Sequence, residues 1–315
     1  MGGILGFAES PAQLLNIIEW ATATDTAPRI IVLGPPEPVT RFQLHRLMEL
    51  VRADGFNIQW AEVRHRVTAW SDLVRQVTRA RTLVLGDPYA AIAHVLLTVA
   101  AHDVRIVVVD DGTATLRYAE QWASGVALQR WHVAHRSLPL RVAGLRAGNL
   151  LGRRSDRVEL FSAMPLDTEL PVMANTYAWA RSRFPAPHVL AGTDLMGTSL
   201  AETGVVSAEA YHQGVVRLIE ERGVARYLPH RHEAPAKLAA IAAQGVQIVR
   251  PDLPMEIHAR RGPVGSSILS FPSTVLHTLP LVLTDTPVSI EALSVDDAWF
   301  TPQARAGERA FVHGI

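Results

Sequence analysis

The feature that most constrains the fold is a run of four apolar residues, Ile106–Val109, followed directly by Asp110, Asp111 and Gly112. A continuous β-branched run without polar alternation is typical of a strand buried on both faces of a parallel sheet. Ligands of open α/β sheets collect beyond the carboxyl ends of the strands, so both aspartates are candidate catalytic residues. An ordinary turn also uses Asp-Asp-Gly, and from this stretch alone both interpretations stay open.

Similar apolar runs precede the acidic pair and alternate with helical patterns. Right-handed crossovers between parallel strands need such helices, so this alternation predicts a doubly wound parallel sheet. The earlier strands are expected at Ile4–Phe7, Arg29–Gly34, Asn57–Val63 and Thr82–Leu85. Across residues 131–167 the pattern loosens into arginine, glycine and serine, which predicts a partly irregular connection with one short strand at Val158–Phe161.

A second series of runs follows, and it repeats the organisation of the first. Its strands are expected at His188–Ala191, Arg226–Leu228, Val246–Val249 and Gly265–Leu269. A chain of 315 residues is also too long for one ordinary core. We therefore predict an α/β protein with two Rossmann-like doubly wound domains, residues 1–168 and 169–315.

Composition excludes several classes of function. The 30 basic and 30 acidic residues cancel, so nucleic acid is not an expected partner. The chain has no cysteine, which excludes disulfides, thiolate metal sites and a cysteine nucleophile. The first residues lack the features of a signal peptide, and no apolar run is long enough to span a membrane. We expect a soluble cytoplasmic protein, able to lie peripherally at the inner face of the membrane.

Several cofactor and nucleophile motifs are absent from the sequence. No Gly-x-Gly-x-x-Gly follows the first expected strand, which argues against NAD or FAD, and no phosphate-binding P-loop occurs. No Gly-x-Ser-x-Gly elbow is present, which argues against a serine nucleophile. We therefore expect a protein without a cofactor.

Two polar segments of the second half could bind phosphate. His230 and Arg231 follow an expected strand, and imidazole, guanidinium and a helix start all suit an anion. A solvated polar loop is the alternative. His230 and His232 with Glu233 lack further clustered ligands, so we predict no metal site. Ser266 and Ser267 precede an apolar run and could form a phosphate cradle, although serines often occupy such positions without a role.

The order of these segments gives a resemblance. The chain resembles the bacterial lipooligosaccharide sialyltransferases and the related capsular polysialyltransferases, two-domain GT-B enzymes that use CMP-sialic acid. The matching motifs span nearly the whole chain and are Glu9–Asn16, Asp110–Gly112, Tyr227–His230, Pro254–Glu256 and Ser266–Ser267. Their order and spacing are more specific than any one of them.

The resemblance implies a fold, a reaction and a division of roles. The two domains would face each other across a cleft, and the enzyme would be an inverting, metal-independent transferase without a cofactor. It would move a sialic-acid-like nonulosonic acid from its CMP donor to a hydroxyl of a glycan or glycolipid acceptor. Residues 1–168 would take the acceptor and supply Asp111 as general base, with Asp110 assisting or holding the turn. Residues 169–315 would bind the donor through His230, Arg231, Glu256, Ser266 and Ser267.

One position departs from the family. Arg231 follows His230 where the family's motif has proline. Two alternatives therefore remain: a GT-B transferase that uses a CDP-alcohol or UDP-sugar, and a non-catalytic nucleotide-sugar-binding relative. Acceptor specificity would lie in the loops around residues 35–41, 64–70 and 87–89. Glu202 and Asp87 are also acidic residues near strand ends, and we expect both to be structural.

Overall fold

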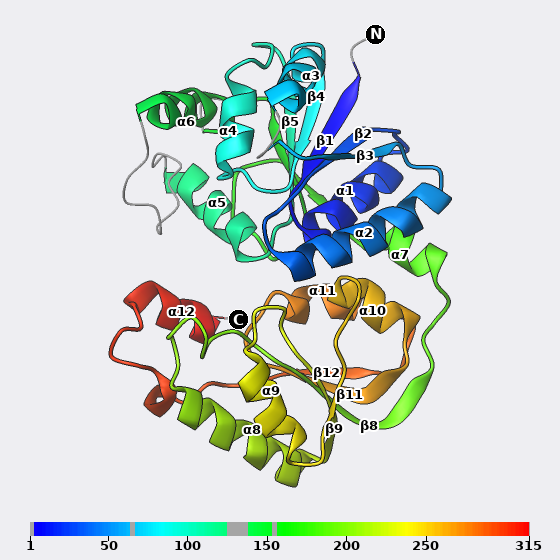
Figure 1. Cartoon of the computed structure of the whole chain (residues 1–315), viewed down its shortest axis with the longest axis vertical. Helices are drawn as coiled ribbons and strands as arrows, with labels where there is room; N and C mark the ends of the chain where they lie inside the picture. Colours follow the sequence, from blue (N-terminus) through cyan, green and yellow to red (C-terminus); the bar gives the residue numbers. More distant parts are fainter. Residues whose placement is uncertain (1–2, 64–66, 125–137, 153–155, 315) are drawn as a thin grey trace. The chain divides into compact units, whose positions relative to one another are not determined.

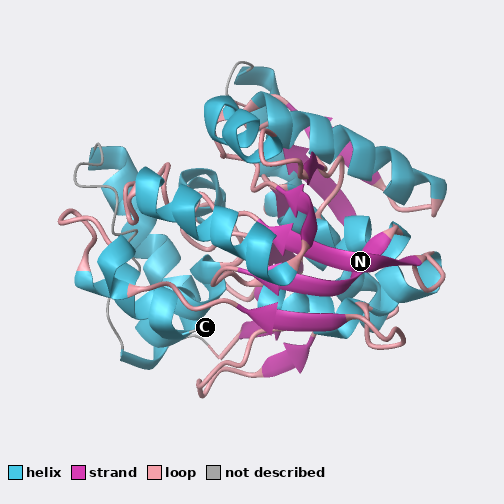
Figure 2. Ribbon diagram, turned by 90° about the horizontal axis from the view of Figure 1, so that it is seen from below, coloured by secondary structure: helices cyan, strands magenta, loops and turns pink. Residues whose placement is uncertain are grey.

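The chain forms two compact α/β units, Met1–Trp179 and Ala180–Ile315 (Figure 1). The computed structural model describes residues 3–63, 67–124, 138–152 and 156–314. Each unit has its own parallel sheet, and helices cover both faces of the strands (Figure 2). This confirms the prediction of two Rossmann-like doubly wound domains, while the cleft between them stays a prediction.

Unit 1 contains a seven-stranded parallel sheet in the order β3-β2-β1-β4-β5-β6-β7. Its strands are β1 Ile4–Ala8, β2 Arg29–Leu33, β3 Ile58–Ala61, β4 Thr82–Leu85, β5 Arg105–Val109, β6 Val158–Ser162 and β7 Val172–Ala174. The apolar run of β5 is fully enclosed, with Val107, Val108 and Val109 all 0% exposed. The direction of strand order reverses between β1 and β4, which is where doubly wound sheets open a binding crevice.

The helices of unit 1 pack in two layers. Helix α1 packs on α2 on one side of the sheet, and α4 packs on α6 on the other (Figure 1). The bounds are α1 Pro11–Ala23, α2 Pro38–Ala53, α3 Val67–Val77, α4 Ala91–Leu97, α5 Thr113–Ser124 and α6 Leu138–Leu151. A short helix, α7 Ala178–Arg183, spans the boundary between the two units.

Unit 2 contains a five-stranded parallel sheet in the order β10-β9-β8-β11-β12. Its strands are β8 Val189–Met196, β9 Val224–Leu228, β10 Gln247–Ile248, β11 Val264–Ser270 and β12 Ser289–Ala292. Its helices are α8 Ala208–Arg222, α9 Pro235–Ala242, α10 Met255–Arg261, α11 Val275–Val282 and α12 Ala306–Gly314, with a 3-10 turn at Asp297–Trp299. Here the strand order reverses between β8 and β11.

Helix α6 corrects the expectation of a partly irregular connection over residues 131–167. The helix buries Ala143, Ala147 and Leu151, which recur every four residues along one face. Because two of these three residues are alanines, the apolar stripe is weak in the sequence and becomes clear only when α4 packs against it. The strand expected near residue 158 is present as β6, whereas residues 131–137 and 153–155 lie outside the described residues.

The boundary of unit 1 lies after the expected division at residue 168. Strand β7 belongs to the first sheet because it pairs in parallel with β6, with Leu160 opposite Val172. Beyond it, the backbone N–H of Trp179 donates to Oε2 of the buried Glu19 at 2.8 Å. These two contacts attach residues 172–179 to unit 1.

Packing of α8 on the 3-10 turn gives a test of the second core. A Cβ atom at Gly214 would lie 2.0 Å from Cη2 of the buried Trp299, so Gly214→Ala must displace that ring. We expect the variant to lose about 1–3 kcal/mol in free energy of unfolding, measured by urea denaturation. Gly307→Ala in α12 is the control, because nothing lies within 4 Å of its added methyl. Equal stability of the two variants would contradict this packing.

Candidate functional site

The acidic pair lies at the carboxyl end of β5, in unit 1. Asp110 is buried, and its Oδ1 accepts from Ser162 Oγ while its Oδ2 accepts from Ala163 N, both at 2.6 Å. Its carbonyl oxygen accepts from Asn16 Nδ2 at 2.9 Å. Both carboxylate oxygens of Asp110 are thus engaged in holding the ends of β5 and β6 together.

Burial is the main influence on the acidity of Asp110. It raises the pKa of Asp110 to about 6, against the opposing hydrogen bonds from Ser162 and Ala163. The negative charge of Asp111 raises the pKa further. The pair therefore consists of one enclosed carboxyl group and one open to solvent.

Asp111 is the open member of the pair. It is half-buried, and its Oδ2 accepts from Gln13 Nε2 at 2.9 Å while Oδ1 lies 3.4 Å from Ser10 Oγ. Its backbone N–H donates to Thr115 Oγ1 at 2.9 Å. Gly112 follows with a φ of 61°, in the left-handed region that favours glycine, which turns the chain into α5.

Hydrogen bonds cap the start of α1. Gln13 N donates to Ser10 Oγ at 3.2 Å, which makes Ser10 the N-cap, and Glu9 N donates to Gln13 Oε1 at 2.7 Å. Because Ser10 and Gln13 also contact Asp111, the cap positions that carboxylate at a helix N-terminus, where negative charge is favoured.

A small hollow lies at the ends of β1, β2 and β4, and Gln13, which donates to Asp111, is among the residues that line it. Its volume is about 10 Å³, and residues that line it include Glu9, Gln13, Leu33, Gly86 and Asp87. It lies at the reversal of strand order, where a ligand is expected. Asp87 Oδ1 accepts from Tyr89 N at 2.8 Å, a bond that shapes its turn, in line with the structural role expected for it.

In unit 2, His230 lies in the loop that follows β9, and a buried carboxylate fixes that loop. The Glu233 side chain is 0% exposed, and its Oε1 accepts from His230 N at 2.6 Å. Its Oε2 accepts from Tyr227 OH at 2.7 Å and lies 3.1 Å from Lys237 Nζ. Burial raises the pKa of Glu233, while Lys237 and the hydrogen bonds lower it. The loop therefore depends on a desolvated carboxylate that its neighbours satisfy.

This network reaches the end of the neighbouring strand β8. Lys237 Nζ donates to Thr198 O at 2.8 Å and lies 3.9 Å from the centre of the Tyr211 ring. The hydroxyls of Tyr211 and Tyr227 are 2.7 Å apart. A Cβ atom at Gly197 would lie 2.1 Å from Glu233 Oε1, so glycine is needed where β8 ends. These hydrogen bonds and the contacts of Lys237 thus link the carboxyl ends of β8 and β9.

The imidazole of His230 is a neutral hydrogen-bond donor near pH 7. Desolvation and the positive charges of Arg231 and His232 lower the pKa of His230 to about 4. The residue as a whole is exposed, and the adjacent positive charges disfavour the protonated ring. Its Nδ1 accepts from His232 N at 3.3 Å, which leaves the ring proton on Nε2. Nε2 can then donate to a phosphate oxygen.

The structure does not bring Ser266 and Ser267 to this loop. Ser267 pairs with Thr193, which pairs with Val224 at the start of β9, whereas His230 follows the end of that strand. Strand β11 spans Val264–Ser270, so Ser266 and Ser267 are its third and fourth residues and lie inside the strand rather than in a loop. Ser266 Oγ donates to Gly192 O at 3.3 Å. The expected strand Gly265–Leu269 agrees with β11 to within one residue at each end, but the expected phosphate cradle lies inside the strand and not in the loop after it.

Another pair of hydroxyls, Ser273 and Thr274, lies at the carboxyl end of β11. These residues connect β11 to α11, and Ser273 Oγ accepts from Val275 N at 3.3 Å. They lie where strand order reverses between β8 and β11, the position expected for a ligand. A serine and threonine directly before an apolar helical run are a sequence signal for a helix start, which could have identified them.

Glu256 and Arg231 complete the residues predicted from sequence. Glu256 lies in the first turn of α10, and its Oε1 accepts from Thr278 Oγ1 of α11 at 2.7 Å. Burial raises the pKa of Glu256, and its hydrogen bonds lower it. Arg231 is exposed in the loop beside His230. The structure therefore brings Glu256 to the helix that begins at Ser273 and Thr274.

The described ranges contain no group of three or more His, Cys, Asp or Glu residues that could hold a metal ion. Within the same ranges, no helix combines the length and apolar character needed to cross a bilayer.

Comparisons with known proteins give similarity of fold only. No protein-family model and no curated protein matches the chain. A UDP-N-acetylglucosamine 2-epimerase from Rickettsia bellii aligns at 10% identity and a TM-score of 0.49, covering 100% of this chain and 88% of the other. A protein described as the same type of epimerase, from Listeria monocytogenes, aligns at 9% identity and a TM-score of 0.49. The alignment covers 88% of this chain and 76% of the other. Glycyrrhiza uralensis UGT73P12, complexed with glycyrrhetinic acid 3-O-monoglucuronide, aligns at 8% identity and a TM-score of 0.42. The alignment covers 100% of this chain and 88% of the other. Identities and TM-scores this low support no statement about activity, which has to be argued from the residues of this chain.

The raised pKa of Asp110 predicts a pH dependence of stability. The folded state binds this proton more tightly than the unfolded state, so the contribution of Asp110 is largest below about pH 4 and is lost as pH rises through about 6. The free energy of unfolding of wild type minus that of Asp110→Asn should fall by about 3 kcal/mol across this interval. Chemical denaturation at several pH values measures the difference, and a rise with pH would contradict the assignment.

Proposed function

We propose that the chain is a glycosyltransferase that uses a nucleotide-activated sugar. The observation that carries the proposal is a division of chemistry between two doubly wound sheets. The carboxyl edge of unit 1 presents an open carboxylate, Asp111, at the start of a helix. The carboxyl edge of unit 2 presents groups that suit a phosphate: the Nε2–H of His230 and the hydroxyls of Ser273 and Thr274.

The finer proposal is that the donor is a CMP-linked nonulosonic acid, and it rests on the motifs that resemble the bacterial sialyltransferases. Asp111 removes the proton of the acceptor hydroxyl as its oxygen bonds to the anomeric carbon. The bond from that carbon to the phosphate oxygen breaks, its electron pair leaves with CMP, and the configuration inverts. The acceptor is a glycan or glycolipid hydroxyl, selected by the loops around residues 35–41, 64–70 and 87–89; residues 64–66 lie outside the described ones.

We assign the general base to Asp111 and a positioning role to Asp110. A general base needs an oxygen that a substrate hydroxyl can reach. Both oxygens of Asp110 are held by Ser162 and Ala163 in a buried position, whereas Asp111 is half-buried. The contacts from Ser10 and Gln13 orient the carboxylate of Asp111.

On the donor side, negative charge develops on the phosphate as CMP leaves, and pre-oriented donors stabilise it. We assign this role to His230 and Arg231 together with Ser273 and Thr274, which take the place of Ser266 and Ser267. Glu256 accepts hydrogen bonds from the ribose hydroxyls of the donor.

Arg231 favours a second candidate donor. A guanidinium beside His230 suits a diphosphate, which carries more negative charge than the single phosphate of CMP. A UDP-sugar or a CDP-alcohol would supply that diphosphate. A non-catalytic nucleotide-sugar-binding protein would bind the nucleotide in unit 2 without transfer.

Replacing the base tests the assignment in unit 1. Asp111→Asn should lower kcat for transfer at least about 100-fold, because proton transfer by a positioned base contributes that much or more. The Kd for the nucleotide should not change, because the nucleotide contacts unit 2. Transfer from candidate donors is measured by release of free nucleotide. Asp103→Asn, an exposed acid before β5, is the control, and wild-type turnover of Asp111→Asn would exclude this base.

Calorimetric titration with CMP, CDP and UDP tests the assignment in unit 2. We expect CMP to bind most tightly, and the double variant Ser273→Ala, Thr274→Val to bind it about tenfold or more weakly, because hydrogen bonds to a charged group are lost. Ser266→Ala, Ser267→Ala is the matched control and should bind as wild type. A preference for UDP or CDP would mean that the donor is a UDP-sugar or a CDP-alcohol bound at the same site. If only the Ser266→Ala, Ser267→Ala variant bound the nucleotide more weakly, this would contradict the placement of the phosphate at Ser273 and Thr274.

A further inference from the structure

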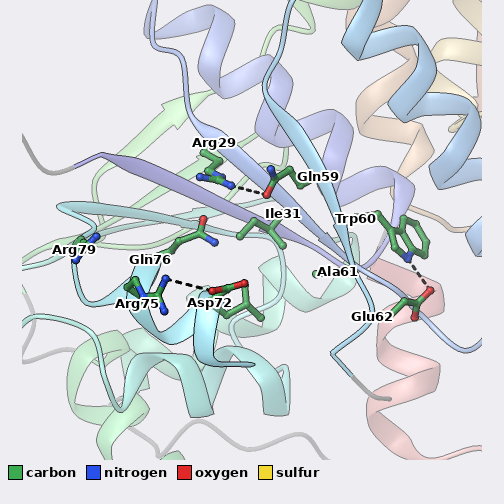
Figure 3. Close-up of a pocket in the computed structure, with 11 residues that line it drawn as sticks. Arg29, Ile31, Gln59, Trp60, Ala61, Glu62, Asp72, Arg75, Gln76 and Arg79 are labelled. Atoms are coloured by element: carbon green, nitrogen blue, oxygen red, sulfur yellow. Dashed lines mark hydrogen bonds and ion pairs between the residues drawn. The ribbon is translucent and has the colours of Figure 1, made fainter. Parts of the chain in front are cut away.

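A second hollow lies on the sheet of unit 1, between the edge strand β3 and helix α3 (Figure 3). Its volume is about 770 Å³, within the range of about 300–1,000 Å³ that small-molecule sites occupy. Strands β2, β1 and β4 separate β3 from β5, so β3 lies roughly 19 Å across the sheet from the strand that carries Asp111. The hollow is therefore separate from the acidic pair.

The charged residues around this hollow are predominantly positive. Arg29, Arg75 and Arg79 line it, against the carboxylates of Asp72 and Glu62. Glu62 is already paired with Arg41, at 2.5 Å. Asp72 lies 3.5 Å from Arg75, with both side chains more than half exposed, so this pair is weak and open to competition. Arg79 forms no ion pair with a described residue. An excess of positive charge remains for an anion.

An unsatisfied acceptor lies among these arginines. The Oε1 atom of Gln76 is buried and finds no hydrogen-bond donor among the described residues. Buried polar atoms are nearly always hydrogen-bonded, so this oxygen lacks a donor. It is closed to solvent in this structure, and a ligand hydroxyl reaches it only after the terminal amide turns toward the hollow. Figure 3 places Gln76 beside Ile31, with Arg29 and Gln59 on one side and Asp72 and Arg75 on the other. A hydroxyl of a ligand that lies between these two sides would satisfy it.

The remaining lining indicates what kind of molecule carries this anion and this hydroxyl. The floor is apolar, with Ile31 and Leu73 each 2% exposed, which suits the C–H groups of a sugar ring. A nucleobase would need an aromatic face, but the ring of Trp60 is stacked on His45 at 4.3 Å.

We propose that this hollow binds an acidic sugar, with its carboxylate or phosphate between Arg75 and Arg79 and a hydroxyl donating to Gln76 Oε1. The proposal does not depend on the transferase reaction, because Arg75, Arg79 and Gln76 lie on or directly after helix α3 and none of them is assigned a role in that reaction.

Calorimetric titration of the full chain tests this with glucuronic acid, glucose 6-phosphate and glucose. Binding of either acidic sugar, or both, without binding of glucose supports the proposal, and the preferred sugar identifies the anion as carboxylate or phosphate. The double variant Arg75→Gln, Arg79→Gln should bind at least about tenfold more weakly, because two hydrogen bonds to a charged group are lost. Arg46→Gln, an exposed arginine on α2, is the matched control.

Gln76→Leu provides a second readout. It removes an unsatisfied buried acceptor, so the melting temperature without ligand should stay the same or rise while acidic-sugar binding weakens. His230→Ala should leave this binding unchanged, so failure here is distinguishable from failure of the nucleotide site. The proposal is overturned if neither acidic sugar binds, if glucose binds equally well, or if the arginine and glutamine variants bind as Arg46→Gln does.

Discussion

The direction of the strands is the constraint on which the rest of this structure depends. Every pairing within the two sheets is parallel, so the loops after the strands of each sheet meet at one edge. Polar residues that are far apart in sequence, such as Ser10 and Asp111, become neighbours for this reason. The same constraint separates Ser267 from His230, since the serine lies in the middle of β11 whereas His230 follows the carboxyl end of β9.

In both units a buried carboxylate holds a loop at this edge. Asp110 accepts from the backbone N–H of Ala163, and Glu233 accepts from that of His230. Each is desolvated, and burial raises the pKa of each. Removing a partner from such a group is costly, because the carboxylate would remain buried and unsatisfied. The residues proposed to contact substrate are next to these buried carboxylates. Asp111 directly follows Asp110, and the backbone N–H of His230 donates to Glu233.

Much of this fold could be predicted from sequence, because β-branched runs and helix caps are local signals. The buried strand before Asp110 is confirmed by burial, and Ser10 caps α1 with a hydrogen bond from Gln13 N. Helix α6 could not be predicted, since its buried face is mostly alanine and depends on α4. Strand β12, at the edge of the second sheet, is short and partly polar, and gives no clear alternation.

The candidate site was only partly predictable, for a related reason. Sequence patterns identified the acidic pair and the His230 loop because each directly follows an apolar run. They favoured Ser266 and Ser267 because these serines match the motif of the family that the chain resembles, although the expected strand Gly265–Leu269 already placed Ser273 beyond its carboxyl end. The unsatisfied Oε1 of Gln76 is likewise a consequence of tertiary packing, with no signal in the sequence.

The central claim is that nucleotide is bound at the carboxyl edge of unit 2, at the reversal between β8 and β11. Hydrogen–deuterium exchange of the full chain, with and without saturating CMP, tests it most directly. We expect new protection in residues 197–199, 229–233 and 271–276, and none at residues 265–267. Protection at residues 265–267 without protection of the loop after β9, or protection confined to unit 1, would contradict it.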